Sequence, residues 1–135
     1  MFPKATRILV VDDMAAMRLR ITNQLTAMGF VSIEQAGNGE EAFAMLEKKR
    51  LENNSIELII SDWSMPVMTG IDFLEKIKAN ECYAKLPFIM VTAEGEKTKV
   101  IRALKAGVSD YLIKPVDKIV LEQKLLTIWA KQAAS

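Results

Sequence analysis

The stretch "RILVVDDMAAMR", from Arg7 to Arg18, places two adjacent aspartates directly after a run of apolar residues. A continuous run of leucine and β-branched residues is typical of a strand buried on both faces of a parallel sheet. Asp12 and Asp13 stand where this strand should end and a helical pattern begins. Two neighbouring carboxylates at the end of a core strand repel each other and lose hydration. This cost indicates that the position serves a purpose beyond folding.

The remainder of the chain alternates between short apolar runs and segments with helical spacing of apolar residues. Besides residues 7–11, strands are expected at 31–36, 56–63, 86–93 and 110–115. Helices are expected at 15–28, 37–52, 70–79, 96–107 and 117–130, and the second carries an extra turn that frays at "ENNS". The inward positions of the second helix are expected to be Ala42, Phe43, Leu46 and Leu51.

Five alternations of strand and helix predict an α/β fold, because parallel neighbouring strands need helical crossovers that cover both faces of the sheet. We expect one doubly wound, five-stranded parallel sheet of flavodoxin-like type, in the spatial order 2-1-3-4-5. The chain has 135 residues, so residues 1–135 are expected to form a single domain.

Composition narrows the possible functions. The formal net charge is +1, and no long charged run suggests a nucleic-acid or membrane surface. No signal peptide or membrane-spanning run is evident, and the single cysteine fits a reducing compartment, so a cytoplasmic location is expected. The absence of histidine excludes Ser-His and Cys-His catalysis and histidine metal ligands.

Ligands of doubly wound folds bind outside the carboxyl ends of the strands. Asp12, Asp13, Asp62, Thr92 and Lys114 fall at such ends. Three clustered carboxylates need either a proton or a cation, and hard divalent ions such as Mg²⁺ prefer oxygen ligands. A lysine and a hydroxyl beside them suit an anion, which is the layout for an aspartyl phosphate.

A purely structural interpretation of each residue is also open. The aspartates could cap the following helix, Lys114 could form a simple salt bridge, and Thr92 could be an ordinary strand residue. A magnesium-dependent phosphatase with an aspartate nucleophile is the alternative from another class. That class places a second acid two residues after the nucleophile, and neither Asp12 nor Asp62 is followed by this D-x-D pattern.

The segments "VVDDMAAMR", "SDWSMPVMTG", "VTAE" and "DYLIKP", with their spacing, resemble the receiver domains of two-component signalling. The resemblance extends from about Thr6 to Trp129 and is strongest to the CheY-like single-domain response regulators. It implies a phosphorylation-activated switch that is not a conventional enzyme and catalyses only its own phosphoryl transfer and autodephosphorylation. It further implies that Asp62 accepts a phosphoryl group from a CheA-like histidine kinase.

The resemblance also implies roles for the neighbouring residues. Asp13, Asp62 and the backbone carbonyl of Ser64 would bind Mg²⁺ directly, Asp12 would bind it through water, and Mn²⁺ would be able to substitute. Lys114 would pair with the phosphoryl oxygens, Thr92 would hydrogen-bond to one of them, and Tyr111 would be an aromatic switch. Ser64 and Glu94 would tune the phosphoryl lifetime, with Ser64 departing from the Asn of the best-studied chemotaxis regulators. The Lys114–Pro115 bond would be cis, and Pro66 and Gly70 would shape the loop after Asp62, with Gly70 tolerating a conformation that other residues avoid.

The output of such a switch would be a changed surface on the fourth helix, fifth strand and fifth helix. Candidate residues on this surface are Val100, Leu104, Tyr111, Ile119 and Leu126. The expected partners are the kinase, a flagellar motor switch protein or another phosphorylation-dependent partner, and a phosphatase. We expect a monomer that binds no nucleic acid and does not insert into membranes. A phosphorelay intermediate or a phosphate sink is the alternative within the same class.

Overall fold

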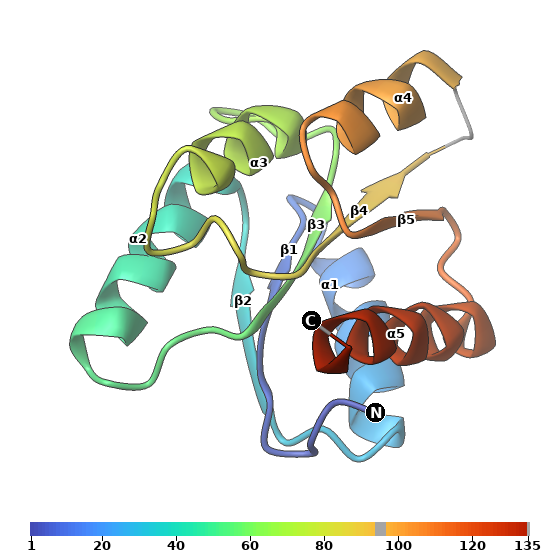
Figure 1. Ribbon diagram of the computed structural model, residues 1–135. Coiled ribbons are helices and arrows are strands. Elements are labelled where there is room, and N and C mark those ends of the chain that lie inside the picture. The colour runs from blue at the N-terminus through green and yellow to red at the C-terminus, as the bar shows by residue number, and fades with distance from the viewer. Residues whose placement is uncertain (94–96, 135) are drawn as a thin grey trace.

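A computed structural model describes residues 1–93 and 97–134, and within them strands and helices alternate along the chain (Figure 1). The strands are β1 (Arg7–Val11), β2 (Ser32–Ala36), β3 (Leu58–Asp62), β4 (Phe88–Thr92) and β5 (Asp110–Ile113). The helices are α1 (Ala15–Ala27), α2 (Gly39–Leu51), α3 (Gly70–Lys78), α4 (Lys97–Lys105) and α5 (Lys118–Ala133). Every predicted element is present, and most strands are a few residues shorter than their apolar runs.

The strands form one parallel sheet in the order β2-β1-β3-β4-β5, as the alternation of elements predicts. The register pairs Val11 with Ser61 between β1 and β3, and Thr92 with Ile113 between β4 and β5. Because all strands run in the same direction, their last residues meet at one edge of the sheet. We call this the carboxyl edge, and the opposite one the amino edge.

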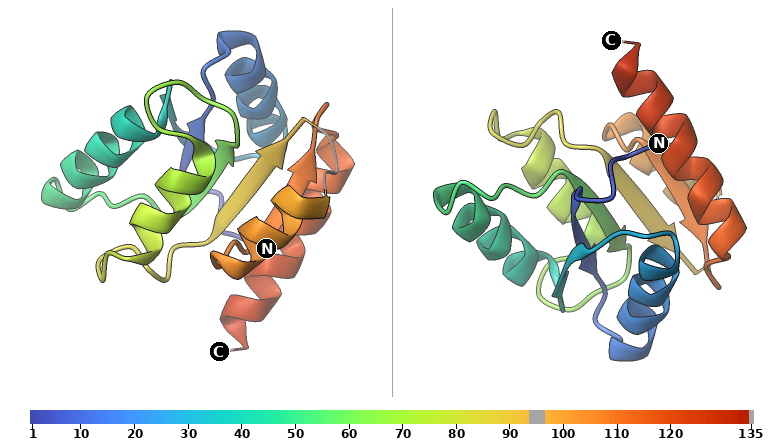
Figure 2. Two further views of the ribbon diagram at one scale, coloured as in Figure 1. Left: turned by 90° about the horizontal axis from the view of Figure 1, so that it is seen from above. Right: turned by 90° about the horizontal axis from the view of Figure 1, so that it is seen from below.

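Helices cover both faces of the sheet. Helices α2, α3 and α4 pack on one face, where Leu46, Phe73 and Ala103 join one apolar core. Helices α1 and α5 pack on the other face, where Leu25 and Leu125 belong to a second core. Figure 2 shows α1 and α5 together on one side of the sheet and α2 and α3 on the other. The sheet therefore holds the strand ends rigidly between two packed layers.

Helix α2 ends at Leu51, one residue before the end expected from the sequence. Ala42 and Leu46 face the core as predicted, but Leu51 is 73% exposed, so its predicted inward position is wrong. Leu51 is the last residue of the helix, and Asn53 follows with a positive φ of 57° that turns the chain away. None of the helices in the described residues combines the length and apolarity needed to cross a bilayer.

Candidate functional site

Four strands bring the predicted site residues to the carboxyl edge. Asp12 follows β1, Asp62 is the last residue of β3, Thr92 is the last residue of β4, and Lys114 follows β5. Because β1, β3, β4 and β5 are consecutive neighbours in the sheet, their ends form one continuous surface. The order of the strands thus brings the predicted site residues together.

Lys114 joins two of the aspartates. Its Nζ lies 3.1 Å from Asp62 Oδ2 and 3.3 Å from Asp12 Oδ2. Asp12, Asp13 and Asp62 each offer a carboxylate oxygen, and these oxygens lie within 4.8 Å of one another. Asp12 and Asp62 are buried, with 1% and 4% of their surface exposed, whereas Asp13 is exposed. The structure therefore brings together three carboxylates and one ammonium group at the end of the sheet.

Burial and neighbouring charges have opposing effects on the pKa values of Asp62 and Lys114. Burial raises the pKa of Asp62, the charge of Asp12 raises it further, and Lys114 only partly offsets these effects. Burial alone would lower the pKa of Lys114, but the carboxylates of Asp62 and Asp12 outweigh burial and raise it. One lysine therefore does not neutralise the cluster, and a further cation would stabilise it.

The side chains around Asp12 fit a metal ion. Asp12 Oδ1 accepts a hydrogen bond from the backbone N–H of Met14 at 2.8 Å. Its other carboxylate oxygen, Oδ2, is buried and accepts no hydrogen bond within the described residues, although Lys114 lies near it. A buried carboxylate oxygen whose described contact is one ammonium group, beside two further carboxylates, is part of the oxygen donor set that Mg²⁺ prefers. The helix-capping interpretation is incomplete, because the N-cap position of α1 is Met14, whose side chain makes no capping hydrogen bond.

Gly70 approaches the backbone of the site closely. A Cβ at this position would lie 2.0 Å from the carbonyl oxygen of Asp62 and 2.9 Å from Cα of Trp63. The Gly70 N–H donates to the carbonyl of Trp63 at 2.8 Å. The sequence correctly singled out Gly70 but for the wrong reason, because among the described glycines only Gly29 and Gly107 have positive φ. Gly70 is required for close approach, and the left-handed residue of this loop is Val67, with φ of 68°.

Two of the predicted switch residues lie on neighbouring strands, Thr92 at the end of β4 and Tyr111 within β5. Thr92 is 2% exposed, and Tyr111 is half-buried against the core on the α2–α4 face of the sheet. The Lys114–Pro115 peptide bond is cis, as the resemblance implied. Ser64 is exposed two residues after Asp62, whereas Glu94 lies outside the described residues.

Most residues of the predicted output surface are accessible. Leu104 on α4 and Ile119 and Leu126 on α5 are 54%, 67% and 45% exposed, and Val100 is half-buried. Ile101, which the sequence analysis did not select, is also 50% exposed on α4. The structure thus places the predicted partner residues on two helices that flank β5.

Several residues that support the site were missed from the sequence. Arg20 Nε and Gln24 Nε2 on α1 both donate to the carbonyl of Val116, at 3.0 and 2.8 Å, and so hold the segment after Lys114. Lys124 on α5 lies over the ring of Tyr111, 5.2 Å from its centroid, and pairs with Asp110 at 3.0 Å. Polar residues on an amphipathic helix signal only an exposed face, so nothing in the pattern identified these contacts.

Comparison with known proteins agrees with this geometry. Residues 8–126 match the response regulator receiver domain family, and the chain belongs to that family. A chemotaxis protein CheY homolog of Campylobacter jejuni is 44% identical over 119 residues, which cover 88% of each chain. The structure of the chemotaxis response regulator CheY4 of Vibrio cholerae has a TM-score of 0.81 at 31% identity, covering 92% of this chain and 98% of that one. A CheX-CheY-BeF₃-Mg²⁺ complex from Borrelia burgdorferi has a TM-score of 0.79 at 29% identity, covering 91% of this chain and 88% of that one.

Receiver domains are signalling switches rather than conventional enzymes, and they bind Mg²⁺ through an acidic cluster of the kind formed by Asp12, Asp13 and Asp62. The similarity to CheY proteins over most of the chain places this one with the chemotaxis response regulators. The chain is accordingly a phosphorylation-activated switch of the CheY-like type.

Proposed function

We propose that Asp62 is the phosphoacceptor and that its donor is a CheA-like histidine kinase. The observation that carries this proposal is the contact of Lys114 with Asp62, 3.1 Å long, at the buried end of the central strand β3. In the transfer, a carboxylate oxygen of Asp62 forms the new bond to phosphorus as the bond from phosphorus to the donor's imidazole nitrogen breaks. The donor must supply the histidine, because this chain has none.

The neighbouring residues stabilise the charge that develops on the phosphoryl oxygens. Lys114 is already held within ion-pair distance of Asp62, so little reorganisation is needed for it to meet those oxygens. The hydroxyl of Thr92 would donate a hydrogen bond to one of the phosphoryl oxygens. Asp12, Asp13, Asp62 and the backbone carbonyl of Ser64 would hold Mg²⁺, which supplies positive charge there. Mn²⁺ also takes oxygen ligands, so we expect it to substitute.

The protein would also catalyse the hydrolysis of its own aspartyl phosphate. Water would attack the phosphorus of the aspartyl phosphate, and the bond to the Asp62 oxygen would break. The exposed position of Ser64, two residues after Asp62, suits a residue that controls the approach of water or of a phosphatase. The resemblance implies a matching role for Glu94.

The phosphorylated form would act through the surface formed by α4, β5 and α5, and the partner would be a flagellar motor switch protein. Movement of Thr92 toward the phosphoryl group would open space for the half-buried ring of Tyr111. Burying that ring would contribute about 1–2 kcal/mol, which changes a two-state population by roughly tenfold or somewhat more. The exposed residues Leu104, Ile119 and Leu126 would form the apolar part of this surface. The protein would act as a monomer in the cytoplasm.

Acetyl phosphate tests the acceptor directly. With Mg²⁺ present, the parent should gain the mass of one phosphoryl group, which base should remove, and Asp62→Asn should gain none. Asp72→Asn, which changes an exposed aspartate on α3, is the matched control and should react as the parent does. Full labelling of the Asp62 variant would instead assign the phosphoryl group to Thr92 or Ser64.

Beryllofluoride tests the output surface without phosphoryl chemistry. It should raise affinity for a motor switch protein by roughly tenfold in the parent. Tyr111→Ala should lose most of that gain while its Mg²⁺ affinity stays unchanged, and Lys114→Ala should accept phosphate but transmit it poorly. Equal gains in the parent and in Tyr111→Ala would exclude Tyr111 as the switch. No gain in the parent would make a passive phosphate store the better account.

A further inference from the structure

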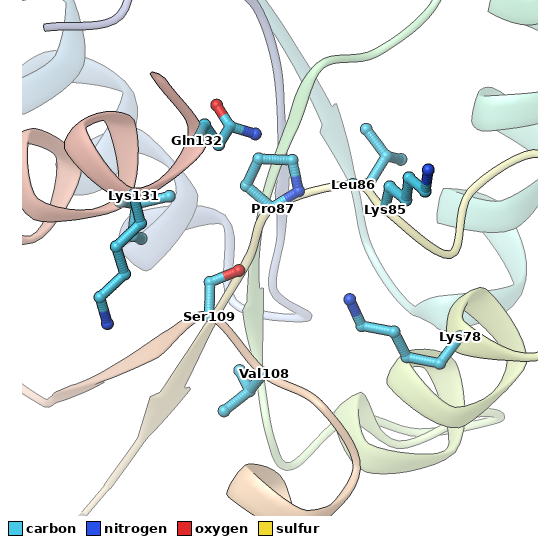
Figure 3. A pocket seen from close by; sticks show the side chains of 9 residues that line it. Lys78, Lys85, Leu86, Pro87, Val108, Ser109, Lys131 and Gln132 are labelled. Carbon is cyan, nitrogen blue, oxygen red and sulfur yellow. The ribbon is translucent and has the colours of Figure 1, made fainter. Parts of the chain in front are cut away.

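A surface pocket lies at the amino edge of the sheet, where β4 and β5 begin (Figure 3). Its volume is about 350 Å³, which is within the range of sites for small molecules. Three lysines from different elements line it: Lys78 ends α3, Lys85 precedes β4, and Lys131 lies near the end of α5. Lysines at the rim of a pocket favour a negatively charged occupant where their charge is not already balanced, which is shown below for Lys78.

Lys78 is the best-positioned of these lysines. Its stem runs across Gly107, where an added Cβ would lie 3.3 Å from Lys78 Cε. Its ammonium group donates to the carbonyl of Ala84 at 3.0 Å, and Figure 3 shows it directed toward Ser109. The glycine and the carbonyl therefore hold the charge in place before any ligand arrives.

The charge of Lys78 is not balanced within the described part of the chain. No carboxylate there lies within ion-pair distance of it, and burial lowers the pKa of its ammonium group. An ammonium group has three donors, and the described residues provide one acceptor. A bound anion would supply both the missing charge and the missing acceptors.

The rest of the pocket suits a ligand with an apolar part. Leu86, Pro87, Val108 and Ile128 line it beside the lysines. Ser109 Oγ accepts a hydrogen bond from the N–H of Phe88 at 3.0 Å, and the described residues show no acceptor for its own proton. The pocket thus presents apolar side chains together with cationic and hydroxyl donors, a combination typical of sites for small organic ligands.

We propose that this pocket binds a small organic anion, with its carboxylate or phosphate group on Lys78 and Ser109 and its apolar body against Pro87 and Val108. The pocket is distinct from the phosphoacceptor site, because it lies at the first residues of β4 and β5 whereas Thr92 and Lys114 lie at their far ends. The proposal does not depend on which residue accepts the phosphoryl group.

Two probes with the same apolar ring test the pocket and distinguish the anionic groups: phenyl phosphate and benzoate. They are titrated into the full chain without Mg²⁺, and backbone amide shifts are followed by NMR. At least one probe should give saturable shifts centred on Val108 and Ser109, and the tighter one identifies the preferred anion. Benzyl alcohol, which has the ring without the charge, should bind at least tenfold more weakly.

Variants of one lysine give the decisive comparison. Lys78→Gln should weaken binding of the preferred probe about tenfold, since a charge-assisted hydrogen bond is lost. Lys78→Arg should largely keep it, and Lys118→Gln, which removes an exposed lysine of α5 outside the pocket, should bind as the parent does. The proposal fails if neither probe gives saturable shifts at the pocket, if shifts centre on Asp62 instead, or if Lys78→Gln binds as well as Lys118→Gln.

Discussion

The two edges of the sheet place lysines in opposite environments. At the carboxyl edge, Lys114 lies between the buried carboxylates of Asp62 and Asp12, which raise its pKa. At the amino edge, Lys78 is partly buried, and desolvation lowers its pKa. The charged form of lysine is therefore stabilised at the carboxyl edge, in Lys114, and destabilised at the amino edge, in Lys78. The charged partners around a lysine, more than its burial, decide which of the two occurs.

Glycine substitutions should show the largest difference between the edges. Gly70→Ala places a methyl group 2.0 Å from the carbonyl oxygen of Asp62, and backbone atoms cannot yield as a flexible side chain would. We expect a loss of about 3 kcal/mol in unfolding free energy, at the upper end of the range for overpacking, together with slower phosphorylation. Denaturant unfolding and acetyl phosphate labelling measure the two effects.

Gly107→Ala is the matched change at the amino edge. Gly107 has φ of 96°, and the atoms nearest to an added Cβ belong to the flexible stem of Lys78. Gly107→Ala should therefore lower the unfolding free energy by about 1–2 kcal/mol, from backbone strain alone. Its phosphorylation should be normal. Equal losses of unfolding free energy in Gly70→Ala and Gly107→Ala would show that the close backbone approach at Gly70 does not set the cost of its substitution.

Lys114→Met and Lys78→Met should change the unfolding free energy in opposite directions. Lys114→Met leaves two buried carboxylates facing each other and should cost about 2 kcal/mol at neutral pH without Mg²⁺. The pKa of Lys114 is raised, so its stabilisation is complete at neutral pH and lost only as the pH rises through that raised value. Mg²⁺ should restore part of the loss.

Lys78→Met removes a desolvated charge and should raise stability by less than about 1 kcal/mol. The gain should shrink as the pH rises, because the lysine itself becomes neutral in the folded protein before it does in the unfolded chain. Thermal unfolding of both variants across neutral and alkaline pH makes the comparison. Destabilisation by Lys78→Met would show that the hydrogen bond to the Ala84 carbonyl, or a counter-charge, outweighs the desolvation of the ammonium group.

Asp62→Asn should stabilise the metal-free protein by roughly 1 kcal/mol at neutral pH. The pKa of Asp62 is raised in the fold by burial and by Asp12, so the folded protein keeps a proton that the unfolded chain has released. Stability therefore falls as the pH rises from the ordinary aspartate range through the raised value. The advantage of the variant should vanish below the ordinary aspartate range. An advantage that is constant with pH would assign it to packing instead of charge.

The sequence predicted the order of the strands and the convergence of Asp12, Asp13, Asp62 and Lys114, because strand ends follow directly from hydrophobic runs and parallel topology. It did not predict the amino-edge pocket. Lys78, Lys85 and Lys131 are far apart in the chain, and each looks like an ordinary exposed lysine of a helix or loop. Nor did it predict the contacts of Arg20 and Gln24 with Val116, since backbone carbonyl partners leave no trace in a residue pattern.

The roles of Gly70 and Val67 show the same limit at the scale of one loop. A glycine after a strand suggests a special backbone conformation, but only the three-dimensional path shows that Gly70 makes room for the Asp62 carbonyl. Val67 holds the positive φ of 68°, which a β-branched residue adopts rarely and at a cost. No pattern rule would have assigned the left-handed position to a valine that lies three residues before a glycine.

The smallest expected effect concerns this strained valine at the carboxyl edge. Toward the amino edge, Gly107 also has a positive φ, which a glycine adopts without strain. Val67 is 76% exposed, so replacing it removes little buried surface. Because Asn tolerates the left-handed region better than valine, Val67→Asn should raise the unfolding free energy by about 0.5–1 kcal/mol. Denaturant unfolding of the metal-free protein measures the change.

Val31→Asn is the matched control, because Val31 is 81% exposed and its φ is not positive. That variant should stay within about 0.5 kcal/mol of the parent, as surface substitutions usually do. Equal changes in the two variants would mean that solvation of an exposed valine, and not backbone strain, sets the difference. A gain confined to Val67→Asn would locate strain in the loop that joins Asp62 to α3. The rate of acetyl phosphate labelling in the same variant then tests whether that strain also positions Asp62.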